Sequence, residues 1–288
     1  MKNKELITRS LTGLVLVAVL CAAIYLGAWT TAALFLVIMC IGLHEWQNLM
    51  HKVGLNPNTF GMYILAILSY FWFCGKTLPI PWSYEAYCLV EIGLPALIIW
   101  CVLFIFISAL FKKAERPMEN IAVTLTGAIY IGIPFALLNF IINPFSNDGG
   151  AYPNILFGFF LLIWSSDVFA YLVGRSLGKH KLCERLSPSK TWEGVLGGLV
   201  ATLGIAYLWS LYAIELNTEM WLLLALLIEI FGVLGDLIES MLKRSVKVKD
   251  SGSLLPGHGG VLDRFDSLLI AAPTVALCLW FYQVLYSL

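Results

Sequence analysis

The amino-acid sequence predicts an all-α, polytopic integral membrane protein with about nine transmembrane helices and an active site on the cytoplasmic face. Three observations predict it: a hydrophobic composition, a series of long apolar stretches, and a regular alternation of basic and neutral loops. Of the 288 residues, 60% are hydrophobic and 12% are charged, whereas a soluble domain is about a quarter charged. So few charges argue against a soluble enzyme, a disordered protein and a nucleic-acid-binding protein.

The apolar stretches define the predicted helices. A helix needs about 20 mostly apolar residues to span a bilayer. Nine stretches approach that length, and the third is the shortest: 10–28, 30–46, 59–74, 91–111, 120–143, 154–174, 193–214, 220–240 and 267–286. The first is not interpreted as a cleaved signal peptide, because no small-residue cleavage site precedes a soluble domain and eight more spans follow.

Basic residues in the loops predict the orientation. Seventeen of the 18 Lys and Arg residues lie at the amino terminus or in even-numbered loops, and only Lys76 lies in an odd-numbered one. Cytoplasmic loops carry the excess of Lys and Arg. We therefore expect a multi-pass protein of the cell inner (cytoplasmic) membrane, with its amino terminus in the cytoplasm and its carboxyl terminus outside.

The loops also indicate where function resides. The sixth and eighth loops are long, basic and rich in Gly, Ser and Pro. We expect residues 1–150 to form an amino-terminal region of five spans. Residues 151–288 are expected to form the catalytic region of four spans, with cytoplasmic loops 175–192 and 241–266.

A polar stripe ends the eighth span. Asp236, Glu239, Ser240 and Lys243 are spaced i, i+3, i+4 and i+7, which puts them on one helical face. Charge in a membrane span marks function by default. The alternative is a snorkelling helix end with a local Glu239–Lys243 salt bridge.

The loop after this stripe combines cations, glycines and carboxylates. Glycines at 252, 257, 259 and 260 permit positive φ, and backbone N–H groups in such a turn can cradle phosphate. Asp263 and Asp266 would share a face if a helix begins there. With Asp236 they offer three hard oxygen ligands, a set that suits Mg²⁺ and substrate phosphates. The alternative is a basic loop that binds anionic lipid headgroups.

The stretch from Ser240 to Asp266 resembles the signature of phosphatidate cytidylyltransferases (CDP-diacylglycerol synthases). It meets every fixed position of S-x-apolar-K-R, four residues, K-D-x-G, two residues, L-P-x-H-G-G, apolar-x-D-R-apolar-D. Upstream, residues 167–175 resemble the D-x-x-A-Y-x-x-G-R stretch of that family, and residues 187–194 resemble its S-P-x-K-T-x-E-G stretch. The specific resemblance covers about residues 164–266.

The resemblance implies a reaction in which CTP and phosphatidic acid of the inner leaflet give CDP-diacylglycerol and pyrophosphate. It implies a Mg²⁺ cofactor. It leaves open whether a second cation such as K⁺ binds and whether the protein forms a homodimer. The residues expected to be catalytic are Asp236, Lys243, Asp263 and Asp266, of which the three aspartates are the expected metal ligands. The residues expected to bind substrate are Ser240, Arg244, Lys249, His258, Arg264, Lys190, Asp167 and Arg175.

Several of these residues also have structural interpretations. Asp167 and Arg175 fit a structural ion pair as well as a substrate contact, and His258 fits a turn residue that caps a backbone group. Thr191 is expected to cap the next helix. His44, with Glu45 at the end of the second span, is interpreted as interfacial, and Glu229 has no assigned role.

Four other functions compete with the cytidylyltransferase interpretation. A CDP-alcohol phosphotransferase would need the D-G-x-x-A-R…G-x-x-x-D-x-x-x-D spacing, which the sequence lacks. A lipid or polyprenol kinase would differ in nucleotide preference. A secondary transporter predicts a midplane site, whereas these acids cluster at one edge. A structural lipid-binding protein would need neither Mg²⁺ nor CTP.

Overall fold

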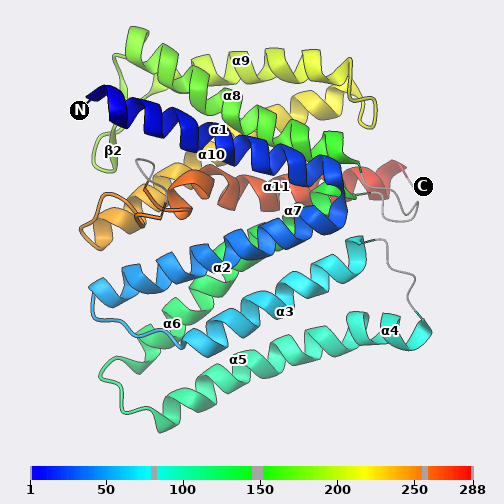
Figure 1. Ribbon diagram of the computed structural model, residues 1–288, viewed down its shortest axis with the longest axis vertical. Helices are drawn as coiled ribbons and strands as arrows, with labels where there is room; N and C mark the ends of the chain where they lie inside the picture. The colour runs from blue at the N-terminus through cyan, green and yellow to red at the C-terminus, as the bar shows by residue number, and fades with distance from the viewer. Residues whose placement is uncertain (1, 79–82, 145–151, 255–258, 287–288) are drawn as a thin grey trace. The chain divides into compact units, whose positions relative to one another are not determined.

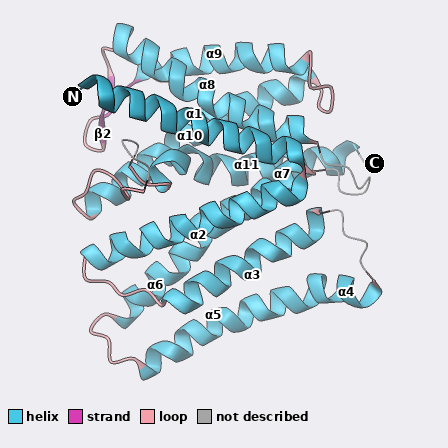
Figure 2. Ribbon diagram, in the orientation of Figure 1, coloured by secondary structure: helices cyan, strands magenta, loops and turns pink. Residues whose placement is uncertain are grey.

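The computed structural model describes residues 2–78, 83–144, 152–254 and 259–286. Figure 2 shows that helices dominate and that two short strands interrupt them. The amino-terminal half contains α1 (Lys2–Leu26), α2 (Ala28–Lys52), α3 (Thr59–Thr77), α4 (Tyr84–Cys88), α5 (Leu94–Phe111), α6 (Pro117–Gly127) and α7 (Ile133–Ile142). The carboxyl-terminal half contains α8 (Pro153–Leu177), β1 (Lys181–Cys183), β2 (Ser187–Thr191), α9 (Trp192–Ser210), α10 (Thr218–Ser245) and α11 (Leu262–Tyr286).

Seven helices of the described residues are long and apolar enough to cross a membrane. They are Ala28–Lys52, Ala86–Phe111, Pro117–Ile142, Pro153–Leu177, Trp192–Ser210, Thr218–Ser245 and Leu262–Leu285. Thr12–Leu26 is a shorter apolar helix, and α3 is not among the seven. The predicted polytopic all-α class is therefore confirmed, whereas the predicted count of nine spans is not.

Two of the long helices contain π-helical turns next to a proline. The turn η1 (Leu89–Gly93) precedes Pro95, and η2 (Ala128–Gly132) precedes Pro134. Proline lacks an N–H and clashes with the carbonyl one turn earlier, and the wider π-turn relieves that clash. Both prolines thus adjoin a local change of helix type.

The chain divides into two compact units, which we describe separately. The first unit comprises residues 1–151 and 250–264, and the second comprises residues 152–249 and 265–288. In the first unit, α3 packs against α2, α5 and α7 (Figure 1). Long-range hydrogen bonds join α2 to α6, from Trp46 Nε1 to the Val123 carbonyl (3.0 Å), and α3 to α2, from Tyr70 Oη to the Ala32 carbonyl (2.6 Å).

The second unit is built on close helix packing. Helix α9 packs along α8 and also contacts α10 (Figure 1). Small residues permit this approach: a Cβ on Gly158 of α8 would lie 2.5 Å from both Trp209 and Trp221. Likewise, a Cβ on Gly235 of α10 would lie 2.5 Å from the Asp266 carbonyl of α11.

The sixth loop contains an antiparallel hairpin that the sequence analysis did not predict. β1 pairs with β2 so that Lys181 faces Thr191 and Cys183 faces Ser187. The strands have no alternation of apolar and polar residues, which is the pattern that normally indicates a strand. The hairpin ends at Thr191, whose side chain accepts a hydrogen bond from Gly194 N and caps α9. The predicted cap is therefore confirmed.

Candidate active site

The polar stripe of α10 lies in the second unit and forms an internal network. Lys243 Nζ lies 2.6 Å from Glu239 Oε2, and the two side chains are only 13% and 4% exposed. Ser240 Oγ donates to Asp236 Oδ1 at 3.3 Å. The Glu239–Lys243 salt bridge expected under the alternative interpretation is present. Because it is buried, it differs from a snorkelling pair at the end of a helix.

Lys190 joins the hairpin to this stripe. Its Nζ lies 2.5 Å from Asp236 Oδ2, with about a quarter of each side chain exposed. The next residue in the chain ends β2 and caps α9, so the hairpin fixes the direction from which the lysine approaches. The structure thus brings together two predicted site residues that are 46 positions apart in the sequence.

Asp266 adds a further carboxylate to the second unit. It lies near the start of α11 and is half-buried, and its Oδ1 accepts from Ser267 N at 2.8 Å. The carboxylates of Asp236, Glu239 and Asp167 all act electrostatically on that of Asp266. Four acids on α8, α10 and α11 therefore repel one another, and Lys190 and Lys243 offset part of this repulsion.

The loop before the hairpin is held by Glu193 at the start of α9. Its carboxylate accepts from Lys179 N (3.1 Å) and from His180 N (3.1 Å), and it pairs with His180 Nδ1 (2.5 Å). Glu193 lies within the motif at residues 187–194, and the sequence alone predicted no role for it. On the facing helix α8, Arg175 Nη1 donates to Tyr171 Oη at 3.1 Å.

Asp263 belongs to the first unit, in which its carboxylate organises the glycine-rich loop. Its Oδ2 accepts from Ser251 N (2.9 Å), Ser251 Oγ (3.0 Å) and Gly260 N (2.8 Å). Gly259 has a φ of 82°, so the positive φ that we expected in this loop is confirmed there. His258 lies outside the described residues.

The remaining predicted cations are on the surface. Arg244 is exposed, and its Nη1 donates to the Val248 carbonyl at 3.3 Å. Lys249 and Arg264 are also exposed. The second unit thus assembles Asp167, Lys190, Asp236, Ser240, Lys243 and Asp266, whereas Asp263 and Arg264 belong to the first unit.

The donor set fits a hard divalent cation in its chemistry. Mg²⁺ is usually bound by one or two carboxylates together with substrate phosphates and water. Asp236 and Asp266 supply mutually repelling carboxylates of the required kind. Across the described ranges, the side chains of His, Cys, Asp and Glu form no group of three that could hold a metal by itself.

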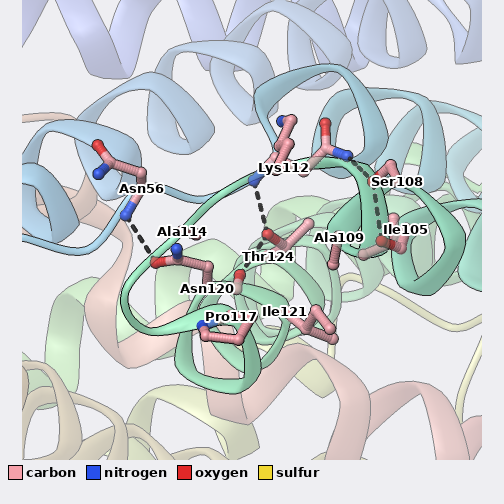
Figure 3. Close-up of a pocket in the computed structure, with 11 residues that line it drawn as sticks. Asn56, Ile105, Ser108, Ala109, Lys112, Ala114, Pro117, Asn120, Ile121 and Thr124 are labelled. Atoms are coloured by element: carbon pink, nitrogen blue, oxygen red, sulfur yellow. Dashed lines mark hydrogen bonds between the residues drawn. The ribbon is translucent and has the colours of Figure 1, made fainter.

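A pocket in the first unit is separate from the predicted site residues. It is lined by Asn56, Asn58, Ile105, Ser108, Ala109, Lys112, Ala114, Pro117, Asn120, Ile121 and Thr124 (Figure 3). Its polar groups bond to one another: Asn56 N donates to Asn120 Oδ1 (2.8 Å), and Asn58 Nδ2 donates to Ser108 Oγ (2.7 Å). These bonds tie the loop after α2 to α5 and α6, a structural role.

The fold and the charged clusters define a multi-pass helical membrane protein that presents acidic and basic side chains suited to a phosphate-bearing substrate. The chain belongs to the cytidylyltransferase family, which it matches over residues 7–282. It is therefore a member of a family of nucleotidyltransferases, and the resemblance found in its motifs is confirmed.

Named relatives are similar along much of the chain. A phosphatidate cytidylyltransferase of Staphylococcus haemolyticus is 35% identical over 274 residues, which is 94% of this chain and 98% of that protein. One from Bacillus subtilis is 41% identical over 190 residues, 66% of this chain and 68% of that protein. One from Staphylococcus aureus strain COL is 41% identical over 179 residues, 61% of this chain and 66% of that protein.

Proposed function

We propose that this protein is a phosphatidate cytidylyltransferase of phospholipid biosynthesis, which transfers the cytidylyl group of CTP to phosphatidic acid. The observation that carries the proposal is the similarity to the S. haemolyticus enzyme, which extends over almost the whole length of both chains. The ion pairs of Lys190 and Lys243 in the second unit support it, because these two lysines come from the stretches that resemble the motifs of the family.

The reaction joins two anions. A phosphate oxygen of phosphatidic acid attacks the α-phosphorus of CTP, a new P–O bond forms, and the bond to pyrophosphate breaks. The lipid phosphate is itself the nucleophile, so the protein needs no Ser, Cys or His nucleophile. Its task is to position the phosphates and to stabilise the charge that develops on the leaving pyrophosphate.

The proposed roles follow from the charges. Asp236, Asp263 and Asp266 would hold Mg²⁺, which neutralises phosphate charge when bound. We assign phosphate binding to Lys190, Lys243, Arg244, Lys249 and Arg264, with Ser240 as a hydrogen-bond donor and with His258, Asp167 and Arg175 as further substrate contacts. Lys190 and Lys243 are held by carboxylates, so we expect CTP to compete with those carboxylates for the two ammonium groups.

We also propose where in the cell the enzyme acts and how it is oriented in the membrane. The distribution of Lys and Arg supports an amino terminus in the cytoplasm, a carboxyl terminus outside, and a site at the inner leaflet of the cytoplasmic membrane. Phosphatidic acid would keep its acyl chains in the bilayer while its phosphate reaches the basic loops. A second cation such as K⁺ and a homodimer remain open parts of the proposal.

The test uses purified protein in detergent with phosphatidic acid, Mg²⁺ and each nucleoside triphosphate in turn. We expect pyrophosphate release, and transfer of α-phosphate label into extractable lipid, with CTP alone, and we expect EDTA to stop both. Transfer of γ-phosphate label into lipid would identify a kinase instead. If helical, well-folded protein transfers neither label, the proposal is wrong.

A further inference from the structure

Glu45 is a buried carboxylate on the largely apolar helix α2. It lies near the end of α2 and is 5% exposed. An ionised carboxylate that leaves water is stable only when hydrogen bonds or opposite charges replace its hydration. Its partners lie in residues 250–254 and 259–264, which we call the signature loop and which belong to the first unit together with α2.

Three donors from the signature loop converge on this carboxylate. Val261 N donates to Oε1 at 2.8 Å, whereas Leu262 N and Ser251 Oγ donate to Oε2 at 2.9 Å and 3.0 Å. The two backbone groups lie at the start of α11, where a helix has N–H groups without an intrahelical partner and favours a negative charge. Glu45 therefore caps α11 from a helix that is distant in the sequence.

Small residues on both sides permit the close approach. A Cβ on Gly252 would lie 2.6 Å from Glu45 Oε1, and one on Gly260 would lie 2.5 Å from Oε2. One turn before Glu45, a Cβ on Gly42 would lie 3.1 Å from Leu262 Cδ2. The loop backbone and the face of α2 thus fit around the carboxylate with no room for larger side chains.

The chemistry of the contact requires a carboxylate. An ionised carboxylate only accepts hydrogen bonds, whereas the amide of glutamine has one acceptor oxygen and an NH₂ group that only donates. With three donors divided between the two oxygens, a glutamine at position 45 places its NH₂ against at least one N–H group. Glu45→Gln therefore keeps the size of the side chain but leaves one N–H group facing another donor.

Ser251 links this carboxylate to Asp263. Its hydroxyl oxygen lies 3.0 Å from both Glu45 Oε2 and Asp263 Oδ2, so the two carboxylates share its one hydroxyl proton. Its backbone N–H donates to the same Asp263 oxygen at 2.9 Å. We propose that Glu45 is a positioning residue that sets the signature loop, and through Ser251 the Asp263 carboxylate, in place. The catalytic consequence rests on the proposed function, in which Asp263 is a metal ligand.

The test compares Glu45→Gln and Ser251→Ala with the matched control Glu115→Gln, which changes an exposed acid of the first unit. In Mg²⁺-free protein, we expect hydrogen–deuterium exchange at Val261 and Leu262 to accelerate at least about tenfold in Glu45→Gln, with the amides of α3 unchanged. We also expect the Mg²⁺ concentration for half-maximal rate to rise about tenfold or more at saturating substrates, as for other residues that orient metal ligands. Ser251→Ala should give a smaller shift in the same direction, because it keeps the backbone donor.

The possible outcomes distinguish the loop contact, the positioning of Asp263 and the proposed function from one another. If hydrogen–deuterium exchange at Val261 and Leu262 is unchanged in both variants, the Glu45 contact does not hold the loop in place. Faster exchange with an unchanged Mg²⁺ requirement would overturn positioning of Asp263. If Glu45→Gln does not fold, Ser251→Ala decides by the same two measurements. If the wild type shows the expected exchange but transfers no cytidylyl group, the proposed function fails while the loop contact stands.

Discussion

Two lysines of the second unit are held by carboxylates at short range. Lys190 contacts Asp236 at 2.5 Å, and Lys243 contacts Glu239 at 2.6 Å. The two pairs differ in burial, because the second has side-chain exposures of only 13% and 4%. The Lys190–Asp236 pair, with about a quarter of each side chain exposed, can exchange partners with solvent or substrate. Removing one partner of the more buried Glu239–Lys243 pair would leave an uncompensated buried charge.

Asp236→Asn should reduce cytidylyl transfer by more than about 100-fold, because several kcal/mol of stabilisation of the developing charge is lost with a metal ligand. The protein should remain helical and inserted, since asparagine has nearly the same size. Steady-state rates in detergent check this, with Glu115→Gln as the control. A full rate in the variant would remove Asp236 from the site.

Lys243→Met should destabilise the second unit by about 3 kcal/mol, because it leaves the Glu239 charge buried. Adding Glu239→Gln should restore most of that stability but not the activity, which requires the lysine. Denaturant or thermal unfolding of the two variants, measured beside their rates, checks the separation. Equal stability of Lys243→Met and wild type would favour a snorkelling lysine.

At the scale of the elements, two helical glycines, Gly158 of α8 and Gly204 of α9, differ in the space around them. Gly158 faces Trp209 and Trp221 so closely that an added methyl group has no room. Gly204 of α9 has nothing within 4 Å of the place where a Cβ would lie. The two positions form a natural pair for a packing test.

Gly158→Ala should lower the free energy of unfolding by about 1–3 kcal/mol through overpacking. Gly204→Ala should raise it by up to about 1 kcal/mol, because alanine favours the helix where space is free. Unfolding of both variants under the same conditions checks the difference. Two shifts of the same sign and size would contradict the packing described for Gly158.

The sequence predicted the helices well because an apolar bilayer leaves few alternatives to a helix. The predicted spans 154–174 and 220–240 lie within α8 and α10. The hairpin escaped prediction because its strands lack an apolar pattern. The role of Glu45 could not be predicted from the sequence, because its three donors lie 206 to 217 positions away and no local pattern reveals so distant a contact.

At the scale of the whole molecule, the basic loops and the apolar helices specify a membrane protein. Of the seven spans, Ala86–Phe111, which contains α5, is the least covered, since only 11% of its most apolar stretch is buried within the protein. The corresponding stretch of Pro117–Ile142 is 56% buried. The spans of the described residues therefore differ in how much of their apolar surface the protein itself covers.

A carboxyl-terminal alkaline phosphatase fusion should be active in cells, and an amino-terminal fluorescent protein should fluoresce in the cytoplasm. Both follow from the 17 of 18 Lys and Arg residues on alternate loops together with an odd number of spans. Phosphatase assays on intact cells check the orientation. An inactive fusion that is made in normal amounts would indicate an even number of spans.

The contact between Glu45 and the signature loop also imposes an order on biogenesis. Ser251 follows Glu45 by 206 residues and Leu262 follows it by 217. At ~5–20 residues per second, roughly 10–40 s of translation separate the carboxylate from its first donor. The nascent first unit therefore holds an unmatched acid until the ribosome has passed α10. A chain that terminates before Ser251 never supplies these hydrogen-bond donors to Glu45. We expect proteolytic quality control in the membrane to degrade such a product.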